Sequence, residues 1–389
     1  MKRFFKGLII TLLVGALATV AFGCDTFASN DNGPKTPGVQ YKTVNGEKQI
    51  VGYVAESGEE NVTITIDSDV KSIKSGAFED NNPIVKIVVP ATVEEIGVGA
   101  FKEMKALTEL ELAYVGASKT AVNEKKTLGY LFGTESYDDG VAITQNYGAS
   151  SATYYLPKTL KKVTVNAKSD YDLPAYAFYG CKNLTDIVLN GSVKSIGNYA
   201  FSGCYNITKI VIPQATTKIG NYAFEGCTRL NGKASTESDA SIQFATTTNL
   251  TEIGSYAFVA TRLVNVTLPE GLVKLGDHAF SSKVTGATLN DASKLQTIVL
   301  PSTLTEIDEY TFYFCEDLTT VTYGANLAKV WSNAFNYCSK ITTFNTAGNT
   351  GISLVATVGA NAFANCNLEA SDLTNVGANN VNEVLGIVG

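Results

Sequence analysis

The chain is built on the sequence SIGNYAFSGCYNITKIVIP (residues 195–213), which recurs at once as KIGNYAFEGCTRL (residues 218–230). Residues 207–212 carry branched apolar side chains at close spacing and stop at Pro213. This pattern is typical of a short strand, because proline cannot donate to a sheet ladder. Residues 198–204 place Ala, Phe and Cys at roughly helical offsets, which predicts one turn of α- or 3₁₀-helix.

The phenylalanine of this phrase marks its recurrence along the chain. Several steps between copies are 23 residues and one is 22, while the longer steps indicate inserted loops. A period in the low twenties lies in the leucine-rich-repeat range, and such units bury their apolar side only by stacking on one another. The recurring residues are Phe78, Phe101, Phe178, Phe201, Phe224, Phe258, Phe280, Phe312, Phe335 and Phe363.

We therefore predict an α/β repeat solenoid over residues 62–371. It would be a leucine-rich-repeat right-handed superhelix of about eleven turns, with short parallel strands on one side and short helical turns opposite. The motif A-F-x-x-C-x-x-L-x-x-I-x-L-P followed by V-x-x-I-G resembles the repeats of the BspA-like proteins, a bacterial surface group, over residues 62–373. That resemblance implies a cell-surface or secreted protein and a role in adhesion.

Residues 1–23 are typical of a secretory signal, with a basic start and an apolar run over residues 8–20 that is too short for a comfortable membrane span. Cys24 follows Ala21, Phe22 and Gly23, which resembles the lipobox of bacterial lipoproteins, although that pattern prefers Leu in place of Ala21 and a small residue in place of Phe22. Cys24 is either lipidated as the first mature residue or left unmodified after cleavage. Both readings export the protein.

The remaining segments flank or interrupt the repeat. Residues 25–40 are polar and rich in Pro, Gly and Asn, which predicts a flexible tether. Residues 41–61 contain an Asn45-Gly46 turn signal and predict a hairpin that caps the first turn. Residues 133–151 and 231–248 are expected to form long exposed loops, and residues 372–389 a C-terminal cap or frayed end.

The formal net charge is −7, and no stripe of basic residues interrupts the repeat. Nucleic acid and anionic membrane surfaces are therefore not expected as partners of the folded body. A membrane would be met only through a lipid anchor at Cys24. We expect a monomer.

Six of the seven cysteines each follow a repeat phenylalanine by three residues. A column of small apolar side chains suits free thiols, which pack well and donate weakly. The alternatives are disulfides between neighbouring turns, since the protein is exported, and a metal site. Zinc needs thiolates that converge, which a single file does not supply, so no metal and no cofactor is expected. The six are Cys181, Cys204, Cys227, Cys315, Cys338 and Cys366.

His278 is the only histidine, and it occupies a place that other turns fill with tyrosine. A Ser-His-Asp or Cys-His nucleophile system would depend on this one residue. No phosphate-binding glycine loop and no calcium loop is found. We therefore predict no catalytic residue and no enzyme activity.

Two columns of the repeat are candidates for recognition. The first consists of tyrosines two residues before a repeat phenylalanine, which either form a contact surface for protein or sugar or shield the neighbouring turn. The second column consists of side chains that point outward from the strands, and these either contact a ligand or are simply solvated. The tyrosines are Tyr176, Tyr199, Tyr222, Tyr256 and Tyr310; the strand positions are Lys86, Glu109, Asp186, Lys209, Asn265, Thr297 and Thr320.

A solenoid offers area rather than a pocket. We therefore expect a non-enzymatic binding module with an extracellular protein or glycan as its partner. The resemblance implies adhesion to host or matrix proteins or to other cells. Two alternatives stay open: a carbohydrate-capture accessory or enzyme component, and a structural spacer without a ligand.

Overall fold

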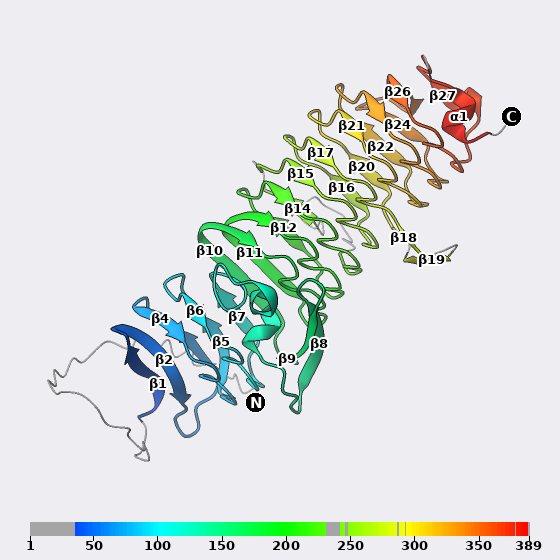
Figure 1. The fold of residues 1–389 in the computed structure, drawn as a ribbon. Helices are drawn as coiled ribbons and strands as arrows, with labels where there is room; N and C mark the ends of the chain where they lie inside the picture. The colour runs from blue at the N-terminus through cyan, green and yellow to red at the C-terminus, as the bar shows by residue number, and fades with distance from the viewer. Residues whose placement is uncertain are drawn as a thin grey trace, which may run out of the picture.

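The computed structural model describes residues 36–230, 242–245, 248–285, 288–291, 293–377 and 379–387. Each coil of chain, called a rung here, stacks on the one before it to give an elongated solenoid, with the first and last described elements, β1 and α1, at opposite ends (Figure 1). The expected signal over residues 1–23, Cys24, the tether up to residue 35 and most of the 231–248 loop lie outside the described residues.

The first strand column contains the longer strands of the rungs, most of which pair parallel with their neighbours. Apolar residues alternate inward, as in β7, where Leu110 and Leu112 are buried and the two glutamates are not. The strands are β3 (Val62–Thr65), β5 (Ile84–Val88), β7 (Glu109–Leu112), β10 (Lys162–Leu173), β11 (Asp186–Ile196), β12 (Ile210–Ile212), β14 (Ile242–Phe244), β16 (Asn265–Thr267), β20 (Thr297–Val299), β22 (Thr320–Tyr323), β24 (Thr343–Thr346), β25 (Gly351–Ser353) and β27 (Leu373–Thr374).

A second strand column runs beside the first and was not expected from the sequence. In most rungs it ends at the apolar residue of the I-G pair, and β10 and β11 are long enough to run through both columns. Its other strands are β2 (Glu47–Val54), β4 (Val70–Ile73), β6 (Glu95–Ile96), β13 (Lys218–Ile219), β15 (Glu252–Ile253), β17 (Lys274–Leu275), β21 (Glu306–Ile307), β23 (Lys329–Val330) and β26 (Thr357–Val358).

The segment opposite the first column is an arc of β-turns, which corrects the helical turn predicted for residues 198–204. Alternate amides bond within the rung, as in Ser202 N to Tyr199 O at 3.2 Å, and the others bond to the next rung, as in Phe201 N to Ala223 O at 2.8 Å. Tyr199 (φ 57°) and Gly203 (φ 74°) are left-handed and interrupt any helix. The arc thereby couples neighbouring rungs, which a helix with internal bonds would not do.

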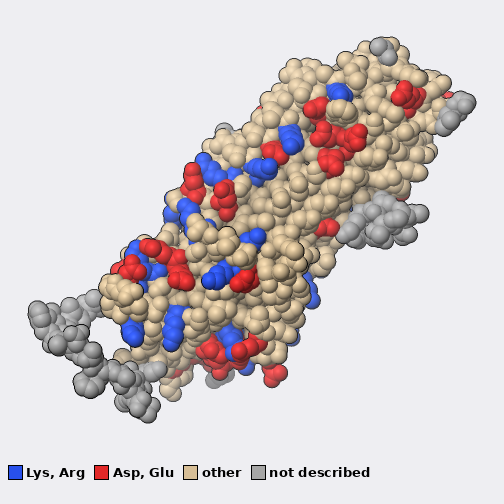
Figure 2. All heavy atoms as spheres, in the orientation of Figure 1, with Lys and Arg blue, Asp and Glu red and all other residues tan. Residues whose placement is uncertain are grey.

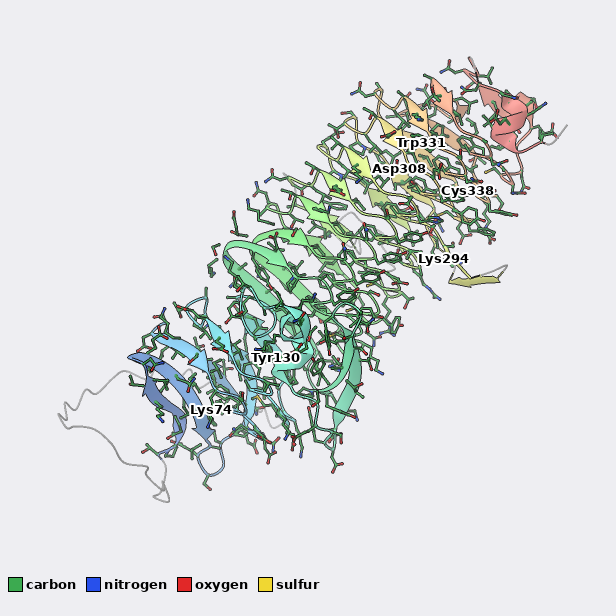
Figure 3. The ribbon with its side chains drawn as sticks, in the orientation of Figure 1. Lys74, Tyr130, Lys294, Asp308, Trp331 and Cys338 are labelled. Carbon is green, nitrogen blue, oxygen red and sulfur yellow. The ribbon has the colours of Figure 1, made fainter. Side chains whose placement is uncertain are left out.

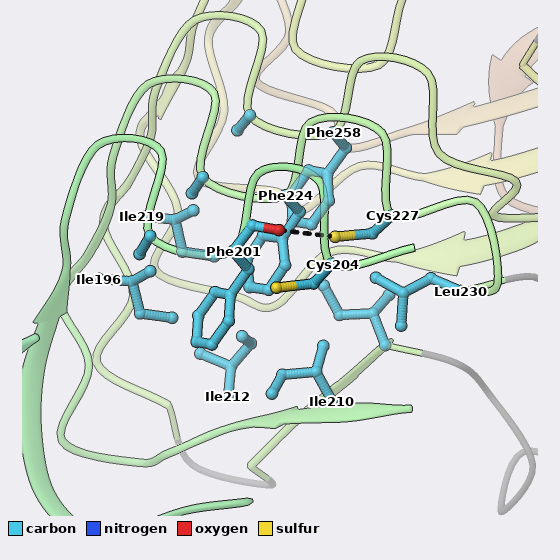
Figure 4. Close-up of a cluster of buried hydrophobic side chains, with 14 of the residues drawn as sticks. Ile196, Phe201, Cys204, Ile210, Ile212, Ile219, Phe224, Cys227, Leu230 and Phe258 are labelled. Carbon is cyan, nitrogen blue, oxygen red and sulfur yellow. Dashed lines mark hydrogen bonds between the residues drawn. The ribbon is translucent and has the colours of Figure 1, made fainter. Parts of the chain in front are cut away.

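The core is a column of phenylalanine rings that runs through the solenoid. Phe201 and Phe224 are fully buried, with ring centroids 5.0 Å apart and planes inclined by 10°. Ile196, Ile210 and Ile212 surround them (Figure 4). The same near-parallel stacking links Phe178 to Phe363 through every intervening repeat phenylalanine.

Both ends of the described solenoid are covered. β1 (Gly38–Val44) pairs antiparallel with β2 across the Asn45-Gly46 turn, and β2 pairs parallel with β4. At the other end, the backbone oxygens of Glu383 and Val384 accept the amides of Asn361 and Phe363, so α1 (Val381–Leu385) takes the place of a further arc.

The segment after Gly133 is a packed hairpin, which corrects the long exposed loop expected at residues 133–151. β8 (Gly140–Asn146) pairs antiparallel with β9 (Ser151–Pro157), and their buried residues include Gln145 and Tyr154. The remaining elements are the antiparallel pair β18 (Lys283–Thr285) and β19 (Thr288–Asp291), and the 3₁₀ turns η1 (Asn123–Lys126), η2 (Leu128–Leu131) and η4 (Ala370–Asp372).

Candidate functional site

The five predicted tyrosines lie in one line on the arc, and His278 completes it. We call this line the ring column. Its members stack face to face, with centroids 4.4–5.1 Å apart and planes inclined by 10° or less. Its order along the solenoid is Tyr176, Tyr199, Tyr222, Tyr256, His278 and Tyr310.

Every residue of the ring column has a left-handed backbone conformation. The φ angle is 57° at Tyr199 and 54° at His278, and the same position holds Gly76 at 67° and Asn333 at 59° in rungs without a ring. Gly and Asn tolerate this conformation, whereas a bulky side chain is disfavoured in it by about 1–2 kcal/mol. Stacking on two neighbours, worth about 0.5–1.5 kcal/mol for each aromatic pair, compensates for that strain.

The ring column presents edges rather than faces. Each ring is half-buried, and the internal members have a neighbour on both faces, so a ligand meets ring edges and polar tips. At the first ring, the ammonium of Lys126 lies 5.4 Å from the Tyr176 centroid. This geometry agrees with the shielding interpretation and still leaves a line of polar tips for recognition.

His278 is a member of the stack. Its Nδ1 lies 3.3 Å from the hydroxyl of Ser281, and burial lowers the pKa of the imidazole below its ordinary value, although Asp277 acts in the opposite direction. The direction of this shift favours the neutral imidazole at pH 7.

The outer face of the first strand column divides into a charged half and a neutral half. Glu109 lies in register between Lys86 and Lys162, and its Oε2 is 3.3 Å from the first ammonium and 3.6 Å from the second. Further along, Asn265, Thr297 and Thr320 occupy equivalent places in register. Of the other predicted positions, Asp186 pairs in register with Lys162, and Lys209 directly precedes β12.

The charged half interleaves acidic and basic side chains. Exposed ion pairs of this kind contribute little to stability. Figure 2 shows the same interleaving of basic and acidic residues over much of the visible surface. The charged half therefore agrees with the solvation interpretation.

A line of threonines beside these strands has a structural role. The hydroxyl of Thr108 donates to the carbonyl of Val85 at 3.0 Å, and Thr319 donates to Gln296 at 3.1 Å. Each threonine thus bonds to the preceding rung. These hydroxyls stabilise the stack and are used within it.

Asp308 and Trp331 were missed by the sequence interpretation. They stand where most rungs have the glycine of the I-G pair, whose Cβ would collide with the preceding rung: at Gly220 it would lie 2.7 Å from the amide nitrogen of Asn198. The amide-to-carbonyl bonds from His278 to Glu309 and from Tyr310 to Ser332 lengthen to 3.3 and 3.4 Å, because a side chain now fills that space.

Trp331 is exposed on the second strand column near Asp308 (Figure 3). Its indole nitrogen donates to Glu306 at 2.8 Å, and the ammonium of Lys329 lies 3.0 Å from its ring centroid. Burial and the neighbouring Glu306 raise the pKa of the Asp308 carboxyl. The signal in the sequence was the loss of glycine from two successive I-G pairs.

The six repeat cysteines are free and buried. Five of the thiols, all but that of Cys181, donate to the carbonyl of the phenylalanine one rung back, as Cys204 does to Phe178 at 3.0 Å and Cys227 to Phe201 at 3.2 Å (Figure 4). The prediction of free structural thiols is confirmed. The alternative interpretation, disulfides between neighbouring turns, is wrong. Burial raises the pKa of the Cys204 thiol to about 12.

Two further observations limit the chemistry of the described part of the chain. No group of three or more His, Cys, Asp or Glu side chains in it could hold a metal ion. None of its helices has the length and apolar character needed to cross a bilayer.

These features define a leucine-rich-repeat solenoid whose long surface is formed by repeated columns of side chains. The sequence matches the model of the BspA type leucine-rich-repeat region, with six copies, over residues 49–120, 150–285 and 284–382. The chain therefore belongs to the BspA-type leucine-rich-repeat family. Its members are typically non-enzymatic binding proteins found at the cell surface or secreted.

Three solved structures of leucine-rich-repeat proteins are similar to this chain. A leucine-rich-repeat protein from T. pallidum is 25% identical over 57% of this chain and 81% of its own, with a TM-score of 0.39. A leucine-rich-repeat protein from Bacteroides ovatus is 19% identical over 85% of this chain and 92% of its own, with a TM-score of 0.36. A leucine-rich cell surface protein from Faecalibacterium prausnitzii is 17% identical over 81% and 95%, with a TM-score of 0.26. No curated protein sequence matches the chain.

Proposed function

We propose that this protein is a non-enzymatic adhesion module, exported and displayed at the cell surface or secreted. It binds an extracellular protein or glycan, on host matrix or on another cell, through an extended face of the solenoid. Export would follow from the signal at residues 1–23, and Cys24 would carry the lipid if the protein is anchored.

The observation that carries this proposal is the ring column. Tyrosine is an effective contact residue, because a large amphipathic surface is ordered at low entropic cost. Stacking holds the rings of Tyr199 and Tyr222 with planes inclined by 4°, so little conformational freedom remains to be lost on binding. A line of such rings suits an extended partner better than a small molecule.

The test is a binding screen of residues 25–389 against immobilised matrix proteins and glycans, with the double variant Tyr199→Asn/Tyr222→Asn in parallel. Asparagine already occupies this left-handed position at Asn333 and Asn361, so the variant keeps the backbone conformation. Tyr205→Asn, which removes an exposed tyrosine outside the ring column, is the matched control.

Saturable binding that the double variant loses and the control keeps would support adhesion through the ring column. Binding that both variants keep would move the site to the strand face or the loops. No binding to any ligand would contradict adhesion for these ligands and favour the alternatives, a carbohydrate-capture accessory or a spacer without a ligand.

A further inference from the structure

Most arcs contain a second left-handed residue, four positions after the ring column. In the regular rungs it is a glycine, as at Gly203 (φ 74°) and Gly226 (φ 67°). Near the C-terminal end it is Phe314 (φ 56°) and then Tyr337 (φ 65°). A bulky side chain at positive φ is strained, and such strain persists where the surroundings or a function require the residue.

The two residues form a small aromatic cluster with Tyr313. Phe314 and Tyr337 stack with centroids 4.0 Å apart and planes inclined by 13°. Tyr313 meets Phe314 edge-on at 4.7 Å and Tyr310 of the ring column at 5.3 Å. Tyr313 thereby braces the pair from the side and connects it to the ring column.

Tyr337 is the exposed member of the cluster, with 38% of its surface accessible. Phe314, one rung back, covers one face of its ring. No other described aromatic ring stacks parallel on the opposite face, because the equivalent position in the next rung is Asn365. Tyr337 therefore has a stacked aromatic neighbour on one face only, whereas the internal members of the ring column have one on both faces.

A chain of amides lies on the side of Tyr337 that has no stacked aromatic neighbour. Asn365 donates from Nδ2 to Oδ1 of Asn336 at 2.9 Å, and Asn336 donates from Nδ2 to Oδ1 of Asn333 at 3.0 Å. The bond from Tyr337 N to Ala364 O, 2.9 Å long, sets Asn365 in the rung directly beside the ring. Asn365 is exposed, and an amide both accepts and donates hydrogen bonds.

We propose that Tyr337 and Asn365 form a binding subsite for a neutral sugar ring of a glycan. This inference rests on the proposed adhesive function and names its partner class. The apolar face of a pyranose would stack on the exposed Tyr337 ring, on the side without an aromatic neighbour, and its hydroxyls would exchange hydrogen bonds with the Asn365 amide. The cluster and its amide border are uncharged, which suits a neutral sugar better than an anionic one.

The experiment is a glycan array probed with the full chain and three variants. Tyr337→Gly removes the ring but installs the residue that Gly203 and Gly226 show to be accepted at this position, so it is expected to fold. Tyr337→Phe keeps the ring without its hydroxyl. Tyr205→Ala removes the other exposed tyrosine named above, on an arc where the second left-handed position is Gly203, and serves as the matched control.

We expect wild type, Tyr337→Phe and Tyr205→Ala to bind the same neutral glycans. Tyr337→Gly should bind them at least about tenfold more weakly, as the loss of one central contact predicts. Equal binding by Tyr337→Gly and wild type would overturn the subsite and leave adhesion standing. Binding of wild type to immobilised proteins only would have the same meaning, whereas no binding to proteins or glycans would overturn both proposals.

Discussion

Single residues in this solenoid are chosen by backbone conformation as much as by side-chain chemistry. One position of each arc is left-handed and is filled by Gly76, Asn333, Tyr199 or His278 according to the rung. Glycine and asparagine tolerate the conformation, whereas the rings depend on stacking between rungs. An isolated tyrosine there would carry the strain without that compensation.

This balance predicts an inverted order of stability at Tyr199. Tyr199→Gly loses stacking on Tyr176 and Tyr222 but relieves the positive φ of 57°. Tyr199→Ala loses the same stacking and keeps the strain, so it should be less stable than the glycine variant by about 1 kcal/mol. Urea unfolding of both variants measures the difference. An alanine variant as stable as the glycine variant would contradict this account.

The thiols give a prediction that depends on pH. Burial raises the pKa of Cys204, Cys315 and Cys366 to about 12. In a Cys24→Ser variant, the six remaining thiols should therefore not react with a thiol reagent at pH 8 while the protein is folded. All six should react once denaturant unfolds it. Appreciable labelling of the folded protein within minutes would contradict the buried column.

The raised pKa of the thiols also makes the free energy of unfolding depend on pH. An unfolded thiol ionises near pH 8.5, whereas the folded thiols stay protonated to about pH 12. The stability that their burial contributes is therefore fully present below about pH 8.5 and is lost as the pH rises towards 12. Unfolding measured at pH 7 and pH 10 should show a lower free energy at the higher value.

At the scale of elements, the β8–β9 hairpin repairs an irregular rung. Residues 128–133 replace the usual arc, and Gln145 of β8 reaches into the stack beside them. Its Oε1 accepts the amide of Gly129 at 2.6 Å, and its Nε2 donates to the carbonyl of Tyr179 at 3.0 Å. One side-chain amide thus performs the bonding that a backbone amide performs in a regular rung.

Gln145→Leu should therefore destabilise the protein although leucine fits an apolar core. It leaves the amide of Gly129 without an acceptor inside the fold, at a cost of about 1–3 kcal/mol. The exposed neighbour Thr144→Ala is the control and should change the free energy of unfolding by less than about 0.5 kcal/mol. Equal effects of the two substitutions in urea unfolding would argue against the repair.

At the scale of the whole molecule, the two strand columns break at different places. The second column is interrupted between β17 and β21, where β16 and β20 of the first column stay paired. The first column is interrupted between β14 and β16, where β15 and β17 stay paired. Wherever one of these insertions interrupts one column, strands of the other column stay hydrogen-bonded, so neighbouring rungs remain stacked. The solenoid therefore keeps one long surface.

The stack also predicts the effect of removing its first layer. A chain that starts after residue 54 lacks β1 and β2, which exposes the edge of β4 and the side chains that Ile50 covers. Exposed strand edges favour self-association. Light scattering should detect oligomers of this variant, whereas a chain that starts at residue 36 should stay monomeric. A monomeric short variant with unchanged hydrogen exchange in β4 would contradict a capping role.

The sequence by itself determined the repeat, its register and its core. Phe201 and Cys204 recur at fixed offsets, so their burial, the free thiols and the alignment of Tyr199 with Tyr222 follow from the period alone. These features could be predicted because identical rungs place identical residues in line. The binding role of the ring column stays a prediction.

Only the tertiary structure decided how the backbone is bonded and where the repeat is broken. The arc is not helical because Phe201 donates to Ala223 in the next rung, a partner that no local pattern near residue 201 reveals. Gln145 and Tyr337 are likewise positioned by contacts with other rungs, Gln145 by a hydrogen bond to Tyr179 and Tyr337 by stacking on Phe314. Local propensity describes bonds within a segment, whereas a solenoid satisfies much of its backbone, and exposes its unusual residues, between segments.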